Sequence, residues 1–304
     1  MQIHELRHFV ILAETLHFAK ASHACNLSPS ALSRSLRRLE EEVGRPLLER
    51  DRRSARLTPQ GELFLKYARS VIQGWEQLQN DIVEGSRVLS GEIRLYCSVT
   101  ASYTVLTGLL ARFREAYPGI HIRLQTGDAA GAVDMVLDGA ADVTVAARPD
   151  RLPGGLCFKA ITETPLVFVA PRVACAVARL VAEREVSWKN VPLVLSAHGL
   201  SRKRVDAWFR RRGIRPSIYA EVSGHEAILS MVSLGCGVGV VPELVIDKSA
   251  LRDEVRVLDA RPALEPYVVG LCVQRRRLDS LVVRAFWDMV DSSRTALTGT
   301  ARAG

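Results

Sequence analysis

The sequence predicts an α/β protein with an all-α N-terminal part: a winged helix-turn-helix, a long linker helix and a two-lobed α/β domain. Three observations support this prediction. Residues 18–43 have the pattern of two helices joined by a tight turn, and apolar residues across 64–82 recur at heptad spacing. From residue 92 onward, strand and helix patterns alternate in two successive sets, which is typical of two α/β lobes.

Length, composition and charge limit the class of protein. The chain has 304 residues, 48% of them hydrophobic, which is enough for two or three packed units. Its net charge of +8 fits a polyanionic partner, but many proteins without such a partner have a similar charge. The first residues lack the order of a secretion signal, and no apolar run approaches the ~18 residues that cross a bilayer. We therefore expect a cytoplasmic protein with no membrane partner.

The six cysteines are scattered and contain no Cys-x-x-Cys pair. In a reducing compartment such thiols behave as small buried hydrophobic groups, and the missing close spacing argues against a redox or metal role. They are Cys25, Cys97, Cys157, Cys175, Cys236 and Cys272.

Four segments are expected along the chain. The winged helix-turn-helix is expected at residues 1–58, and the linker helix and hinge at 59–91. The two-lobed α/β domain is expected at 92–292, followed by a flexible tail over 293–304. Within the two-lobed domain, lobe I is expected at 92–162 and 267–292, and lobe II at 163–266.

The N-terminal helices follow from local patterns. Residues 4–15 place apolar side chains on one helical face and should form the floor of the domain. A short alanine-rich helix then leads to a tight turn at Asn26–Leu27. Ser28 and Pro29 suit the cap and the first position of a second helix. Its inward stripe is expected to be Leu32, Leu36, Leu39 and Val43.

The outer face of that second helix carries hydroxyl and guanidinium groups. Arginine offers paired donors to guanine edges or binds phosphate, and serine bonds to bases or backbone. With the preceding helix and turn, this face predicts binding to double-stranded DNA, while the alternative is a solvated helix face. The predicted DNA contacts on this helix are Ser28, Pro29, Ser30, Ser33, Arg34 and Arg37.

A basic hairpin is expected directly after the helix-turn-helix. Residues 47–58 have apolar ends around a basic, polar tip, which is the pattern of a β-hairpin wing. Its arginines are predicted to reach phosphates or a minor groove, and the alternative is that some of them pair with Glu49 and Asp51. They are Arg50, Arg52, Arg53 and Arg56.

A long helix is predicted over residues 59–86. Thr58 and Pro59 supply its cap and first position, and a hinge over 85–91 ends it. Its heptad seam is too long to bury on one compact neighbour, so we expect pairing with a second chain; the alternative is packing on its own domain. The predicted dimerisation residues are Phe64, Ala68, Val71, Trp75, Leu78 and Ile82.

The remaining two thirds alternate strands and helices. This order predicts mostly parallel sheets, ligands at the carboxyl ends of strands and a cleft between the lobes. The expected strands are 93–97, 120–124, 143–146, 166–169, 193–195, 218–222, 238–241 and 268–273, and a last helix is expected at 278–290.

Catalytic motifs are missing from this region. The glycines over 235–239 follow a helix and lead into a strand, the reverse of the order that cradles phosphate. His225 and Glu226 are not followed by a histidine at zinc spacing, and no nucleophile elbow frames a serine. We therefore expect a protein that is not an enzyme and has no metal and no cofactor.

The predicted positions of strand ends and helix starts favour a small carboxylate as the ligand. Strand ends and helix starts bring together hydroxyls, backbone donors and arginines, although capping and surface charge would explain several of the same residues. The predicted effector contacts are Ser98, Thr100, Ala101, Arg148, Ser201, Arg202, His225 and Glu226.

Several motifs together resemble the LysR-type transcriptional regulators along essentially the whole chain. They lie at residues 6–9, 24–34, 39–40, 44–48 and 56–61, with leucine at position 48 where the family usually has phenylalanine. The resemblance implies a winged helix-turn-helix joined to a two-lobed effector domain like that of periplasmic binding proteins. It also implies a homodimer that assembles into a homotetramer on promoter DNA and contacts RNA polymerase.

A narrower likeness is carried by residues 90–92, 97–101, 126–130, 208–211 and 224–227. These resemble family members that activate the acetohydroxy acid isomeroreductase gene of branched-chain amino acid synthesis. The implied inducers are 2-acetolactate and 2-aceto-2-hydroxybutyrate. Their carboxylate is expected at Arg148 or Arg202, and their hydroxyl and keto oxygens at Ser98 and Thr100. The alternative is a LysR-type regulator of another pathway that senses a different small carboxylate or the redox state.

Overall fold

The computed structural model describes residues 1–50, 55–82, 89–182 and 186–290. These residues form two compact units, one built mainly by the residues up to 82 and the other by the residues from 89 onward. The expected tail over 293–304 and most of the expected hinge lie outside the described residues. In the part of the chain that is described, no helix is both long and apolar enough to cross a bilayer.

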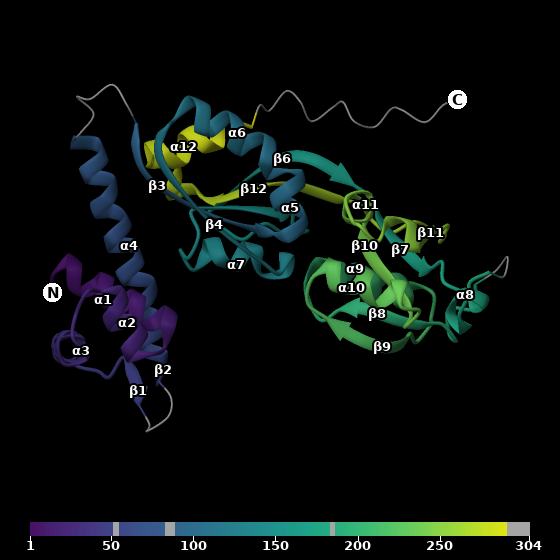
Figure 1. Cartoon of the computed structure of the whole chain (residues 1–304), viewed down its shortest axis with the longest axis horizontal. Coiled ribbons are helices and arrows are strands. Elements are labelled where there is room, and N and C mark those ends of the chain that lie inside the picture. Colours follow the sequence, from purple (N-terminus) through teal and green to yellow (C-terminus); the bar gives the residue numbers. More distant parts are fainter. Residues whose placement is uncertain (51–54, 83–88, 183–185, 291–304) are drawn as a thin grey trace. The chain divides into compact units, whose positions relative to one another are not determined.

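The first unit joins short helices, a hairpin and one long helix, in the predicted order (Figure 1). Its elements are α1 (Ile3–Thr15), α2 (Phe18–Ala24), α3 (Pro29–Val43), β1 (Leu48–Arg50), β2 (Ala55–Leu57) and α4 (Pro59–Ile82). The buried face of α1 packs on the start of α4, where the rings of Phe9 and Phe64 meet edge to face with centroids 5.1 Å apart. Burial of such aromatic pairs is a main source of stability in a small domain.

Local chemistry explains the turn between α2 and α3. Asn26 adopts the left-handed conformation with φ 54°, which asparagine tolerates better than most residues. The Ser28 hydroxyl accepts a hydrogen bond from the amide of Ala31 at 3.2 Å, and Pro29 is the first helical residue, as predicted. Leu32, Leu36 and Leu39 are buried, as expected.

Val43 is not part of the inward stripe. Its side chain is 37% exposed. Helix α3 ends at this residue, and the chain turns away through Gly44 in the left-handed conformation, so the last turn of the stripe does not reach the core.

The hairpin is held against α3 by one carboxylate. Strands β1 and β2 pair antiparallel with Leu48 opposite Leu57, which confirms the predicted wing. The Glu40 side chain of α3 accepts hydrogen bonds from the amides of Leu47 at 2.9 Å and Leu48 at 3.2 Å. The start of the wing is therefore tied to the second helix of the helix-turn-helix.

The start of α4 has room for glycine alone at position 61. A Cβ on Gly61 would lie 2.0 Å from the carbonyl oxygen of Leu47, whereas a Cβ on Gly74 in the same helix would meet nothing within 4 Å. We expect Gly61→Ala to lower the free energy of unfolding of this unit by about 1–3 kcal/mol, since the backbone must shift. Gly74→Ala should raise it by roughly 0.5–1 kcal/mol, because helix propensity improves without a clash. Urea unfolding checks both variants, and equal effects would contradict the packing argument.

The first lobe of the second unit is built on a sheet with strand order β4-β3-β5-β12-β6. Helices α5, α6 and α12 cover one face, where Phe113 and Phe286 pack 5.0 Å apart, and α7 covers the other face. Its elements are β3 (Ser90–Ser98), α5 (Val99–Thr104), α6 (Leu106–Ala116), β4 (Gly119–Gly127), α7 (Ala132–Leu137), β5 (Val143–Ala147), β6 (Leu156–Thr164), β12 (Tyr267–Gln274) and α12 (Leu281–Asp288).

The second lobe has strand order β11-β7-β10-β8-β9. Helices α8 and α9 pack on one face and α10 and α11 on the other. Its elements are β7 (Leu166–Pro171), α8 (Ala176–Leu180), β8 (Pro192–Ser196), α9 (Gly199–Arg211), β9 (Ser217–Val222), α10 (His225–Ser233), β10 (Val238–Pro242), α11 (Glu243–Asp247) and β11 (Val255–Leu258).

The predicted strands are present, but the prediction of mostly parallel sheets is wrong. Strand β3 is parallel to β4 and β5, whereas β12 runs antiparallel to both β5 and β6. In the second lobe β7 is likewise antiparallel to β10 and β11. The cause is the route of the chain: β6 leads out of the first lobe into β7 of the second, and β12 returns to the first lobe. Each sheet therefore contains one crossing strand, β12 in the first lobe and β7 in the second, that runs opposite to the other strands.

A buried ion cluster joins three segments of the first lobe. Asp142 is 2% exposed and accepts hydrogen bonds from Arg94 at 2.7 Å and Arg277 at 2.7 Å. It also accepts one from the backbone amide of Arg94 at 2.9 Å. The carboxylate thus links β3, the start of β5 and the segment after β12.

Candidate functional site

The recognition face of α3 is exposed in the way the sequence predicted. Ser28, Pro29, Ser30 and Arg34 lie exposed on the side opposite the buried leucines, and Ser33 is half-buried between them. The hydroxyls of Ser28 and Ser30 are 3.0 Å apart. This face combines small hydroxyl groups with a guanidinium, so it is slim and rich in hydrogen-bond donors.

Arg37 differs from Arg34 in having an intrahelical partner. Its Nε donates to Glu41 at 2.9 Å, and both side chains are largely exposed. A surface pair of this kind contributes little to stability and is screened by salt, so Arg37 can exchange Glu41 for another anion. Arg37 still lies on the exposed surface of α3.

The wing is described only in part. Arg56 is exposed on β2 opposite Glu49 of β1, with no ion pair between them among the described contacts. Arg50 ends β1, but its side chain, like Arg52 and Arg53, lies outside the described residues.

The predicted seam of α4 divides into two parts. Phe64 and Ala68 are buried in the core of the first unit, and Val71 packs against that core. The alternative of packing on the same domain holds for this half, because α1 already covers it. Farther along, Trp75 is 42% and Leu78 47% exposed, and the side chain of Ile82 lies outside the described residues.

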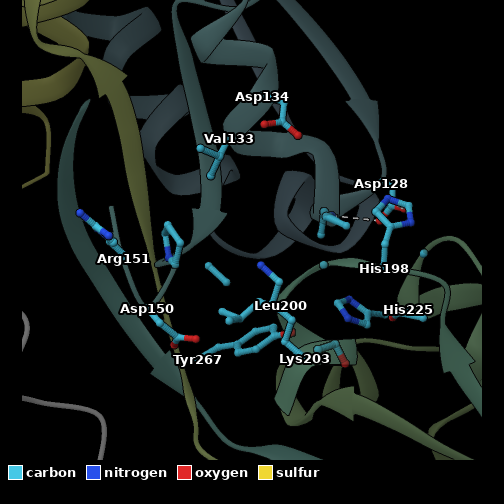
Figure 2. A pocket seen from close by; sticks show the side chains of 18 of the residues that line it. Asp128, Val133, Asp134, Asp150, Arg151, His198, Leu200, Lys203, His225 and Tyr267 are labelled. Carbon is cyan, nitrogen blue, oxygen red and sulfur yellow. Dashed lines mark hydrogen bonds and ion pairs between the residues drawn. The ribbon is translucent and has the colours of Figure 1, made fainter. Parts of the chain in front are cut away.

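A cavity of about 440 Å³ lies between the two lobes of the second unit, and we call it the large cavity (Figure 2). Residues after β4 and β5 line it from the first lobe, and the start of α9 lines it from the second. Its titratable side chains are those of Asp128, Asp134, Asp150, Arg151, His198, Lys203 and His225.

A cavity of about 50 Å³ adjoins it, and we call it the small cavity. It has apolar walls with a few hydroxyl groups, including those of Ser98 and Thr100. Both cavities share the same boundary residues, which are Ala129, Ala147, His225 and Tyr267. Together they form one cleft with a charged part and a small, mostly apolar part.

Five of the eight predicted effector residues line this cleft. Ser98, Thr100 and Ala101 line the small cavity, Ser201 lines the large one, and His225 lines both. The β3–α5 junction is shaped by Ser98, whose hydroxyl accepts a hydrogen bond from the amide of Ala101 at 3.2 Å.

The two predicted arginines are engaged elsewhere. Arg148 is exposed and lies over the ring of Phe158 at 5.9 Å, and it lines neither cavity. Arg202 is bound by Asp206 at 3.0 Å and by Glu221, and it also lines neither cavity. Each guanidinium faces groups of its own lobe, so this structure does not bring either arginine into the cleft.

Arg151 and Lys203 are the cationic residues that sequence reasoning missed. Helix α9 begins at Gly199 rather than at Ser201, and it places Lys203 on the cavity wall and Arg202 away from it. Neighbouring helical residues differ in direction by about 100°, so Lys203 can line the cavity while Arg202 is turned toward Asp206 and Glu221. A glycine-based start at Gly199, with φ +87°, was the available signal.

Two titratable groups on the boundary have shifted pKa values. Burial lowers the pKa of His225 even though Glu226 and Asp128 act to raise it, which favours the neutral imidazole. Burial raises the pKa of Tyr267 to about 12, so its hydroxyl stays protonated. Positive charge for an anion in the cleft therefore has to come from Arg151 and Lys203 rather than from His225.

Two buried cysteines of the second unit, Cys97 and Cys272, are poor candidates for redox chemistry. Burial raises the pKa of both Cys97 and Cys272 to about 11, which disfavours the reactive thiolate. Burial also raises the pKa of Cys25 in the first unit.

Comparison with known families decides the class of protein. Residues 3–62 match the model of the bacterial regulatory helix-turn-helix proteins of the lysR family, and residues 86–294 match the LysR substrate binding domain. The chain belongs to the LysR family. The winged helix-turn-helix followed by a two-lobed α/β domain is thereby confirmed.

Among the relatives of this LysR-family chain are two curated regulators of similar length. The transcriptional activator IlvY of Haemophilus influenzae is 39% identical over 292 residues, covering 96% of this chain and 100% of the relative. The transcriptional regulator IlvY of Escherichia coli is 40% identical over 293 residues, covering 95% and 99%. These relatives are regulators, and the prediction that the chain is not an enzyme is confirmed.

Solved structures share the fold at lower identity. A full-length OxyR variant from Pseudomonas aeruginosa superimposes with a TM-score of 0.68 at 20% identity, covering 95% of this LysR-family chain and 94% of that one. The crystal structure of CbnR, a LysR family transcriptional regulator, gives 0.65 at 21% identity, covering 95% and 98%.

Proposed function

We propose that this LysR-family regulator activates the acetohydroxy acid isomeroreductase gene in response to 2-acetolactate or 2-aceto-2-hydroxybutyrate. The observation that carries the proposal is the identity of about 40% to IlvY activators, which extends over 95% of the chain and so includes both the recognition helix and the cleft. The likeness of individual motifs, such as residues 97–101 in the small cavity, supports the same assignment.

On DNA, α3 enters the major groove of the promoter and the wing lies along the backbone. Arg34 and the serines of α3 contact bases or phosphates, and Arg50, Arg52, Arg53 and Arg56 of the wing contact phosphates. The exposed half of α4, with Trp75 and Leu78, pairs two chains, and two such dimers form a homotetramer that contacts RNA polymerase.

In the cleft, the inducer lies across the boundary between the two cavities. Its carboxylate faces Arg151 and Lys203, and its keto and hydroxyl oxygens face Ser98 and Thr100. The short alkyl groups pack on the boundary alanines. Neither a metal nor a cofactor is required by this arrangement, since recognition uses charge, hydrogen bonds and shape.

The proposal is tested with purified protein and DNA from upstream of the gene that encodes it. The melting temperature of the protein and its footprint on that DNA are measured with and without 2-acetolactate. We expect 2-acetolactate to raise the melting temperature and to change the footprint on that DNA, because a ligand that binds the folded protein stabilises it and shifts its conformations. Lys203→Met should weaken acetolactate binding by roughly tenfold through loss of a charge-assisted contact.

Lys248→Met is the matched control, because Lys248 is an exposed lysine at the end of α11 that lines neither cavity. An unchanged melting temperature and footprint with acetolactate would contradict the proposed inducer. Equal effects of the two lysine variants would contradict the proposed place of the carboxylate.

A further inference from the structure

One hydrogen-bonded bridge joins the lobes at the small cavity. Thr100, in the first turn of α5, belongs to the first lobe, and Glu226, in the first turn of α10, belongs to the second. The Thr100 amide donates to Oε1 of Glu226 at 2.9 Å, and the Thr100 hydroxyl donates to the same oxygen. The residues are 126 positions apart in the chain, so this contact exists only in the folded domain.

The Thr100 side of the bridge is shielded from solvent. Thr100 is 3% exposed, and the hydroxyl of Tyr103 donates to its oxygen at 3.3 Å. Glu226 is half-buried and reaches Thr100 because Gly224, with φ +87°, turns the chain sharply before α10. Hydrogen bonds to a carboxylate are stronger than those to a neutral acceptor, and they gain strength away from water.

The bridge occupies the polar groups that a ligand would need. Thr100 lines the small cavity, yet its amide and its hydroxyl hydrogen are both directed at Glu226. A ligand oxygen that is to accept a hydrogen bond from Thr100 must replace the Glu226 carboxylate there. An anionic ligand also repels that carboxylate, so the two do not share the site.

We infer that Glu226 is an internal competitor of the inducer for Thr100, and that binding in the small cavity breaks the bridge between the lobes. This inference rests on the proposed function, because it assumes an oxygen-rich anion in the cleft. It gives the inducer the differential affinity that a switch requires, since the inducer binds well only to the arrangement in which Glu226 has left Thr100. The lobes lose the Thr100–Glu226 contact in that arrangement, and they can then move to a different relative position.

Substitution of Glu226 tests the competition. We expect Glu226→Ala to tighten 2-acetolactate binding by roughly tenfold or more, because no bond to a charged acceptor has to be broken first. Glu226→Gln should fall between Glu226→Ala and the unaltered protein, since its amide oxygen is a weaker, neutral acceptor. If Glu226 instead contacted the inducer or merely supported the cleft, both variants would bind acetolactate more weakly, and that result would overturn the inference.

Glu221→Gln is the matched control. Glu221 binds Arg202 within the second lobe and does not reach the first lobe in any described contact. Its substitution removes the same charge from the same lobe and should leave acetolactate affinity unchanged. A tightening equal to that of Glu226→Gln would show a general charge effect and overturn the inference.

Hydrogen exchange of the full-length protein without ligand separates the bridge from the proposed inducer. The Thr100 amide should exchange slowly in the unaltered protein and at least tenfold faster in Glu226→Ala, because its acceptor is lost. An unchanged exchange rate would overturn the bridge. If Thr100 exchange is faster in Glu226→Ala but neither protein binds acetolactate, the bridge is supported and 2-acetolactate is not the inducer.

Discussion

Arg34→Ala is expected to weaken binding to the upstream DNA by roughly tenfold to hundredfold. A paired contact from arginine to a guanine edge contributes about 1–3 kcal/mol of discrimination, and Arg34 is exposed on the recognition face of α3. The free energy of unfolding of the variant should be nearly unchanged, since the buried stripe of Leu32, Leu36 and Leu39 lies on the opposite side of the helix. Fluorescence anisotropy at several salt concentrations measures the affinity.

The salt series also identifies the kind of contact. If Arg34 reads a base, the variant should lose discrimination between the upstream DNA and a scrambled duplex, with little change in the salt slope. Arg37→Ala is the matched control, because Arg37 lies one turn farther along and is paired with Glu41. We expect it to reduce affinity less than Arg34→Ala does. Equal affinity of the Arg34 variant and the unaltered protein would show that α3 is not the reading element.

Asp142→Asn is expected to lower the free energy of unfolding of the second unit by about 3–5 kcal/mol. The carboxylate is 2% exposed and lies between two guanidiniums, so a neutral amide leaves buried positive charge without its counter-ion. Asp259→Asn is the control, since Asp259 pairs with Arg261 on the open surface and the effect there should be small. Urea unfolding at neutral pH compares the two variants.

The same cluster predicts how stability depends on pH. Burial acts to raise the pKa of Asp142, but the charges of Arg94 and Arg277 and their hydrogen bonds outweigh it and hold that pKa below its ordinary value. The ionised group therefore stabilises the fold at every pH above the pKa of an unfolded aspartate, and this contribution is lost as the pH falls through the lower folded-state pKa. The difference in stability between the unaltered protein and Asp142→Asn should shrink over that acidic range. A difference that stays constant would contradict the assignment.

Prediction from sequence succeeded where a few neighbouring residues decide the structure. The cap at Ser28, the left-handed turn at Asn26 and the first helical position of Pro29 each depend on contacts within four residues. Most strands of both lobes were also found, since buried strands appear as short apolar runs, but β6 and β11 were not predicted. The antiparallel direction of β7 and β12 was missed, because the direction of a strand depends on where the rest of the chain has gone.

Side-chain partners were harder to predict than elements. The heptad seam of α4 was visible in the sequence, but whether Phe64 faces α1 or a second chain depends on which apolar surface reaches it first. Arg202 was expected in the cleft, yet its guanidinium forms ion pairs with Asp206 and Glu221 of its own lobe. An arginine is satisfied by the nearest suitable acceptors, and the sequence does not contain those distances.

By itself, the sequence determined the helix-turn-helix, its exposed Ser/Arg face, the long helix and two α/β lobes, because local spacing and apolar periodicity encode each of them. Only the tertiary structure decided that Arg151 and Lys203 line the large cavity and that Thr100 is held by Glu226. These arrangements join residues far apart in the chain, and they depend on the exact start of a helix and on how two lobes meet. Such contacts arise from packing, which has no periodic signature along the chain.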